Sequence, residues 1–138
     1  MTIIEAIREY MARCPLLRDG ILNVEYLGAK PTEYVIESVP TPGIVRKYAD
    51  GSALKEYLFL FASREYFGGE VLYNLENSGF YERLADWIRE QNKKRALPQL
   101  ASGKTAQEIS VVSSGYLFDS TEESARYQIQ LRLLYYEA

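Results

Sequence analysis

The pattern of apolar positions between residues 54 and 94 predicts a long strand followed by an amphipathic helix. Residues 57–62 are apolar at every position, which is typical of a strand that is covered on both faces. Beyond the two glycines at 68 and 69, apolar residues recur at the spacing of one helix face. We therefore expect this strand and this helix to supply the centre of the core, with the residues Leu58, Leu60, Phe80, Leu84, Trp87 and Ile88.

Similar patterns place the other elements on either side of this unit. Residues 3–14 carry an apolar helix face, and Thr2 and Glu5 match a capping box at its start. Between residues 70 and 94 the pattern fits either one continuous helix or two helices separated near Ser78 and Gly79. Alternating apolar and polar residues predict strands over 22–26, 34–39, 44–49, 52–65, 109–118 and 127–135, the fifth with a bulge at Ser114-Gly115.

These elements predict one α+β domain over residues 1–138. An N-terminal helix and a central helix are expected to pack on a mixed, mainly antiparallel sheet. With two central helices the order of elements is α-β-β-β-β-α-α-β-β. The length of 138 residues suits one domain, since domains usually contain about 100 to 150 residues.

Asp50-Gly51 is the strongest hairpin signal in the chain, because a two-residue type I′ turn needs positive φ at both positions. It joins the strand over 44–49 to the strand over 52–65. The second strand would measure about 45 Å, which exceeds the core of a domain of this size. We therefore expect its first half to leave the core as part of a projecting hairpin that mediates assembly. The residues predicted for this assembly arm are Arg46, Lys47, Tyr48, Asp50, Gly51 and Lys55.

The composition excludes several classes of chemistry. The chain has no histidine and a single cysteine, which excludes an internal disulfide, a cysteine-based zinc site and histidine-dependent nucleophilic catalysis. Gly103-Lys104-Thr105 resembles the end of a phosphate-binding loop, but Pro98 stands where that motif needs a glycine. We expect no enzymatic activity, no catalytic residue, no cofactor and no metal site. A small enzyme that acts through lysine or carboxylates is the remaining alternative.

Charge and hydropathy limit the classes of partner that the chain is expected to bind. The net charge of −3 argues against a broad nucleic-acid surface, which would show a clustered basic excess. No apolar run approaches the ~18 to 20 residues of a membrane span. The N-terminus lacks the basic and apolar regions of a secretory signal, so we expect a cytoplasmic product. The 12 tyrosines suit either half-buried strand faces or a subunit contact surface.

Several residue runs carry a resemblance to a known family. They are Tyr57-Leu-Phe-Leu-Phe-Ala-Ser-Arg-Glu-Tyr66, Asn74-Leu-Glu-Asn-Ser-Gly-Phe80, Trp87-Ile88, Ser114-Gly-Tyr-Leu-Phe-Asp119 and Ala125-Arg-Tyr-Gln-Ile-Gln130. With them the chain resembles a family of short proteins in tailed phages and prophages of Gram-positive bacteria, described as minor capsid or tail-completion proteins. Its expected order of elements is similar to that of the lambda-type tail terminator.

The resemblance implies a structural protein of the virion that is assembled in the bacterial host cytoplasm. It implies self-association into a hexameric ring that caps the phage tail tube and joins it to the head-connector proteins. DNA could pass through the lumen of such a ring without specific nucleic-acid binding, and no membrane is involved. The alternative is a neck or head-completion adaptor protein that binds the portal side.

Overall fold

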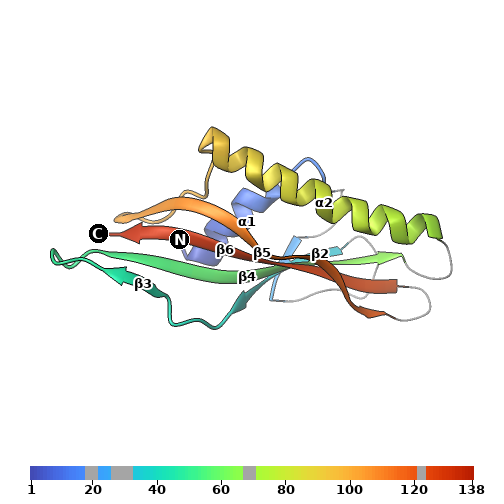
Figure 1. Cartoon of the computed structure of the whole chain (residues 1–138), viewed down its shortest axis with the longest axis horizontal. Helices are drawn as coiled ribbons and strands as arrows, with labels where there is room; N and C mark the ends of the chain where they lie inside the picture. The colour runs from blue at the N-terminus through green and yellow to red at the C-terminus, as the bar shows by residue number, and fades with distance from the viewer. Residues whose placement is uncertain (18–21, 26–32, 67–70, 121–123) are drawn as a thin grey trace.

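The computed structural model describes residues 1–17, 22–25, 33–66, 71–120 and 124–138. In these residues, two helices lie on one side of a long, twisted sheet (Figure 1), so the α+β class is confirmed. The elements are α1 (Ile3–Ala12), β1 (Leu22–Val24), β2 (Glu33–Val39), β3 (Ile44–Lys47), β4 (Ala53–Tyr66), α2 (Val71–Lys94), β5 (Lys104–Ser120) and β6 (Ser124–Glu137).

The centre of the sheet is the antiparallel pair formed by β4 and β6. Every residue of β4 has a partner in β6, from Ala53 opposite Glu137 to Tyr66 opposite Ser124. The strand order is β1-β2-β4-β6-β5, and β3 continues the edge of β4 beyond the end of β2. Of these pairs, β1–β2 is parallel and the others are antiparallel, so the expected mixed, mainly antiparallel sheet is confirmed.

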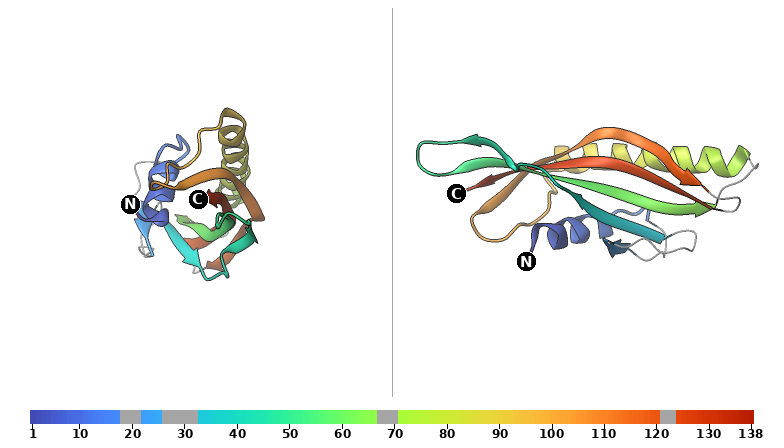
Figure 2. Two further views of the ribbon diagram at one scale, coloured as in Figure 1. Left: turned by 90° about the vertical axis from the view of Figure 1, so that its left-hand side faces the viewer. Right: turned by 90° about the horizontal axis from the view of Figure 1, so that it is seen from below.

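The long partner strand corrects one expectation about the hairpin. The first half of β4 does not leave the sheet, because β6 pairs with it as far as Ala53. What projects at this end of the molecule is the short strand β3 and the turn that follows it (Figure 2).

Both helices agree with their predicted positions, and α2 decides between the two interpretations. Thr2 caps α1, accepting a hydrogen bond of 3.3 Å from the backbone N–H of Glu5. Helix α2 is continuous through Ser78 and Gly79, so the interpretation with two helices is wrong. A glycine inside a helix costs about 1 kcal/mol, and the packing of α2 on the sheet exceeds that cost.

The core lies between the helices and one face of the sheet. Phe80, Leu84 and Ile88 of α2 are buried as expected, and Trp87 is partly buried with its ring 5.1 Å from that of Tyr10 in α1. Aromatic pairs at this separation stabilise a fold by more than the burial of their surface alone, because the ring edges and faces attract one another. The two helices therefore contact one another above the sheet.

The expectation that Leu58 and Leu60 belong to this core is wrong. Phe59 and Phe61 point toward the helices and are fully buried, whereas Leu58 and Leu60 lie on the opposite face and are half-buried. Successive side chains of a strand point to opposite faces. The two apolar sets therefore face different environments, and in the described residues helices cover only the face with the phenylalanines.

The predicted bulge at Ser114-Gly115 is confirmed, and it brings β5 against α2. The register with β6 shifts between Ser113 and Tyr116. A Cβ atom on Gly115 would lie 2.5 Å from the Cβ and Cγ atoms of Tyr81. The buried Tyr81 hydroxyl donates to the carbonyl of Tyr127 at 2.9 Å and lies 2.7 Å from the Ser63 hydroxyl. Since Tyr81 has one hydroxyl hydrogen, Ser63 donates to Tyr81.

We predict that Gly115→Ala destabilises the fold while Gly79→Ala does not. The added methyl at 115 overlaps the root of the Tyr81 side chain, which cannot move without displacing α2, so we expect a loss of about 1 to 3 kcal/mol in the free energy of unfolding. The methyl at 79 meets the flexible end of Arg83 at 3.1 Å and removes a helix glycine, so a gain of about 0.5 to 1 kcal/mol is expected. Urea unfolding of both variants measures the difference, and equal effects would contradict this packing.

Candidate assembly surface

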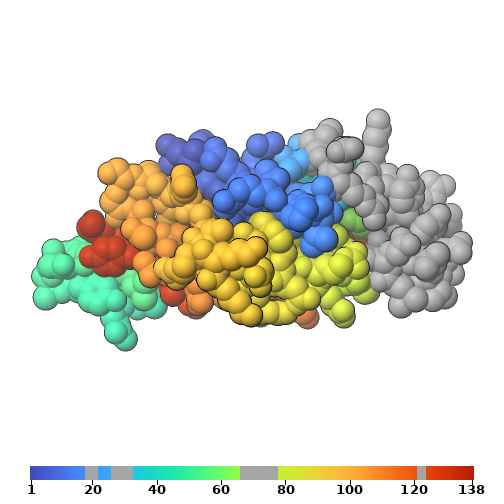
Figure 3. Space-filling view, turned by 90° about the horizontal axis from the view of Figure 1, so that it is seen from above, coloured from blue at the N-terminus to red at the C-terminus, as the bar shows by residue number. Residues whose placement is uncertain are grey.

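The residues predicted for the assembly arm lie at one end of the molecule, on the β3–β4 hairpin. Figure 3 shows this hairpin beside the C-terminal residues. All four residues of β3 are exposed, Arg46 and Lys47 included. Tyr48, Asp50 and Gly51 form the exposed turn, whereas Lys55 is half-buried in β4. The structure thus brings five of the six residues together on an exposed loop and edge.

The turn differs from the predicted type I′ turn. Of its residues, Gly51 alone has a positive φ, at 92°. The Gly51 N–H donates to the Tyr48 carbonyl at 3.1 Å, and the Tyr48 N–H donates to the Ser52 carbonyl at 2.9 Å. This is a three-residue loop with glycine at the bulge position. The Asp50 carboxylate accepts from the Ser52 hydroxyl and N–H, which lowers the pKa of Asp50.

Lys55 belongs to an ion cluster that ties the two central strands together. Its ammonium pairs with Glu137 of β6, and Lys104 of β5 reaches the same carboxylate at 3.7 Å. Hydrogen bonding from Lys55, with the charge of both lysines, lowers the pKa of Glu137, and the same hydrogen bond raises the pKa of Lys55. Lys55 is therefore engaged within the chain, unlike its exposed neighbours in β3.

A second exposed apolar surface lies at the other end of the molecule, on the last part of β5. Val112 is 51% exposed and Phe118 is 58% exposed, and Tyr116 and Leu117 are also exposed. The guanidinium of Arg126 lies 5.2 Å from the centre of the Phe118 ring. Our sequence interpretation placed these residues in a strand and missed their exposure. The signal was the run of three apolar residues at 116–118, since an alternating strand cannot bury all three on one face.

The first part of β5 is protected along its outer edge by one side chain of α2 and by that of the residue that follows the helix. The Asn92 amide donates to the carbonyl of Ile109 at 2.7 Å and accepts from the N–H of Ile109 at 3.1 Å. Arg95 donates to the carbonyl of Gln107 at 3.3 Å. Asn92 thus makes the two hydrogen bonds that a neighbouring strand would make at Ile109.

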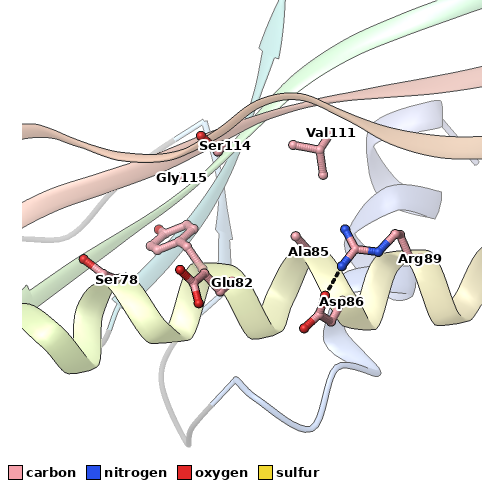
Figure 4. Close-up of a pocket in the computed structure, with 9 residues that line it drawn as sticks. Ser78, Glu82, Ala85, Asp86, Arg89, Val111, Ser114 and Gly115 are labelled. Atoms are coloured by element: carbon pink, nitrogen blue, oxygen red, sulfur yellow. Dashed lines mark hydrogen bonds and ion pairs between the residues drawn. The ribbon is translucent and has the colours of Figure 1, made fainter.

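An open groove of about 500 Å³ runs between α2 and β5. Figure 4 shows its charged side chains following one another along α2, with Asp86 paired to Arg89. The polar side chains of the groove are mainly solvated residues on one face of α2. Among the described residues of the groove, no nucleophile lies within hydrogen-bonding distance of a base. The groove is lined by Ser78, Tyr81, Glu82, Ala85, Asp86, Arg89, Val111, Ser114 and Gly115.

Metal ligands, membrane-spanning helices and relatives each bear on the class of site. The described part contains no group of three or more acidic, cysteine or histidine side chains that could hold a metal ion. Neither of its helices combines the length and the apolar character that a membrane crossing needs. No protein-family model and no curated protein sequence matches the chain.

We predict that Asn92→Ala weakens the fold by exposing the edge of β5 at Ile109. The variant leaves one N–H and one carbonyl without their partner, which costs about 1 to 2 kcal/mol in the free energy of unfolding. Alanine is the better helix former, so any loss comes from the edge contacts. Lys93→Ala, at an exposed neighbouring position of α2, is the control and should change stability by less than about 0.5 kcal/mol. Equal stability of the two variants in urea would refute the role of Asn92.

We predict that Glu137→Gln lowers stability at pH 7 and that this difference disappears in acid. The pKa of Glu137 is lowered from 4.5 in the fold, so its stabilisation is present above the unfolded value and lost as pH falls through the folded value. Calorimetry of the variant and the native chain at pH 7 and at successively lower pH measures this. Glu108→Gln, at an exposed site of β5, is the control. A difference that persists unchanged in acid would contradict the ion cluster.

Proposed function

We propose that this chain is a structural subunit of a phage tail, which assembles into a hexameric ring, caps the tail tube and joins it to the head connector. The residue runs at 57–66, 74–80 and 114–119 support this proposal through their resemblance to tail-completion proteins. The α+β fold, with an N-terminal and a central helix on a mixed sheet, agrees with the order of elements that the resemblance implies. The place of action is then the virion, after assembly in the host cytoplasm.

The observation that carries the proposal is the pair of exposed apolar surfaces at opposite ends of the sheet. A ring built from identical subunits needs two different complementary patches on each subunit, because every contact is head to tail. One patch lies on the β3 hairpin, with Ile44, Val45 and Tyr48 each more than 40% exposed. The other lies on the last part of β5. Exposed apolar clusters of this kind mark interaction sites in soluble proteins.

The face of the sheet opposite the helices supports a role as the wall of a lumen. Two of its arginines are matched by carboxylates: Arg126 pairs with Glu37, and Arg132 lies 3.5 Å from Glu56. Gln128 donates to the Tyr116 hydroxyl at 2.6 Å on the same face. Arginines that are already paired attract phosphates weakly, which suits a channel that lets DNA pass without holding it.

Light scattering and electron microscopy test this function. We expect the purified chain, alone or with phage tail-tube protein, to form closed rings whose mass is six times 15.8 kDa, about 95 kDa. In micrographs the rings should sit at the ends of tubes and halt their growth. The control is the same tube protein incubated with an unrelated monomeric protein of similar size.

A strict monomer that ignores tube ends would refute this function. Capture of head-connector protein in place of tube protein in a pull-down would favour the neck adaptor that binds the portal side. Turnover of a small molecule by the purified chain would instead favour the enzyme alternative.

A further inference from the structure

We infer that neighbouring copies join edge to edge, with β3 of one copy hydrogen-bonded to the last part of β5 of the next. This inference rests on the proposed function and specifies the contact within it. It follows from the way in which the two outer edges of the sheet are protected over some residues and left open over others.

The edge of β5 is protected along its first part only. Asn92 of α2 engages the N–H and the carbonyl of Ile109, and Arg95, the residue after α2, donates to the carbonyl of Gln107. Beyond residue 111, no hydrogen bond joins the backbone of β5 to the described side chains of α2, which are those of residues 78–94. An edge strand with free N–H and carbonyl groups is a template for pairing with another chain.

The open part also lacks the side chains that keep edge strands apart. Residues 112–118 are Val-Ser-Ser-Gly-Tyr-Leu-Phe, with no charge and no proline. Charged residues and proline are two of the usual protections of a free edge, and a bulge, which β5 does have between Ser113 and Tyr116, is another. Here Val112, Leu117 and Phe118 are exposed, so pairing with a further strand would also remove apolar surface from water.

The β3 strand of a second copy is the occupant that the structure favours. It is itself an edge strand, paired on one side with β4 and, among the described residues, with no strand on the other side. It presents Ile44 and Val45 to solvent, which matches the apolar character of the open part of β5. Its cations Arg46 and Lys47 complement Asp119, an exposed carboxylate at the end of β5 without an ion pair among the described residues.

The two edges of one copy cannot meet each other. β3 pairs with β4 near Lys55, whereas the open part of β5 lies across β6 from residues near Ser63. Eight residues of strand separate these positions by about 26 Å. The edges also lie on opposite sides of the sheet. Their contact therefore has to form between copies, and it is head to tail because the two surfaces differ.

Chemical cross-linking tests the contact. Val45→Cys and Leu117→Cys are combined in a chain whose buried Cys14 is replaced by alanine, and the sample is treated with a short bismaleimide under the conditions that give assembly. Since the two cysteines of one copy are separated by about 26 Å along the strands alone, the reagent can join only cysteines of different copies. We expect a ladder of covalent dimers, trimers and higher species on denaturing gels. Val45→Cys with Thr105→Cys, which places the second thiol on the first part of β5, is the control and should give no ladder.

A second pair of variants tests the edge without cross-linking. Leu117→Lys places a charge on the open part of β5 and should shift the mass in light scattering from the assembly to the monomer. Thr105→Lys, also exposed on β5, should leave the mass unchanged. Circular dichroism checks that both variants fold.

The outcomes separate this contact from the proposed function. Rings at tube ends without a ladder, or with Leu117→Lys still assembled, would overturn the edge contact and leave the function standing. A ladder in a sample that ignores tube ends would support the contact and count against the function. A chain that stays monomeric, gives no ladder and ignores tubes would overturn both.

Discussion

The antiparallel pairing of β4 with β6 is the interaction on which the rest of the structure depends. Each strand contains 14 residues, and they are paired from end to end. On one side β4 holds β2 and β3 in sequence, and on the other side β6 holds β5. Because side chains alternate across a strand, the pairing also presents Phe59, Phe61, Ile129 and Leu131 as one continuous apolar floor for both helices.

Most of the elements could be predicted from the sequence because their patterns are unambiguous. The Thr2 cap, the alternation along β6 and the bulge at Gly115 each follow from a local rule that the surrounding structure does not override. The face of β4 could not be predicted in the same way. Both of its side-chain sets are apolar between residues 57 and 62, so periodicity alone cannot distinguish the face under the helices from the opposite one.

The candidate assembly surface could also be predicted only in part. The β3 hairpin could be located because Asp50-Gly51 marks a turn and the strand after it is too long for the core. How much of the hairpin projects could not be predicted. It depends on how far β6 pairs along β4, which is a contact between residues about 80 positions apart in the chain. The protection of Ile109 by Asn92 was also beyond prediction, since asparagine near a helix end is ordinarily explained by local capping and solvation.

The placement of α2 has a geometric consequence for any assembly of this chain. Its last turns seal one half of an edge and leave the other half bare, while β3 lies diagonally across the sheet from that bare half. A contact between opposite corners displaces each copy along the strands as well as across them. In a closed assembly built on such a contact, the strands must be inclined to the axis, because the tilt and stagger of strands are linked as in a barrel. Helix α2 would then set that inclination through the part of the edge that it protects.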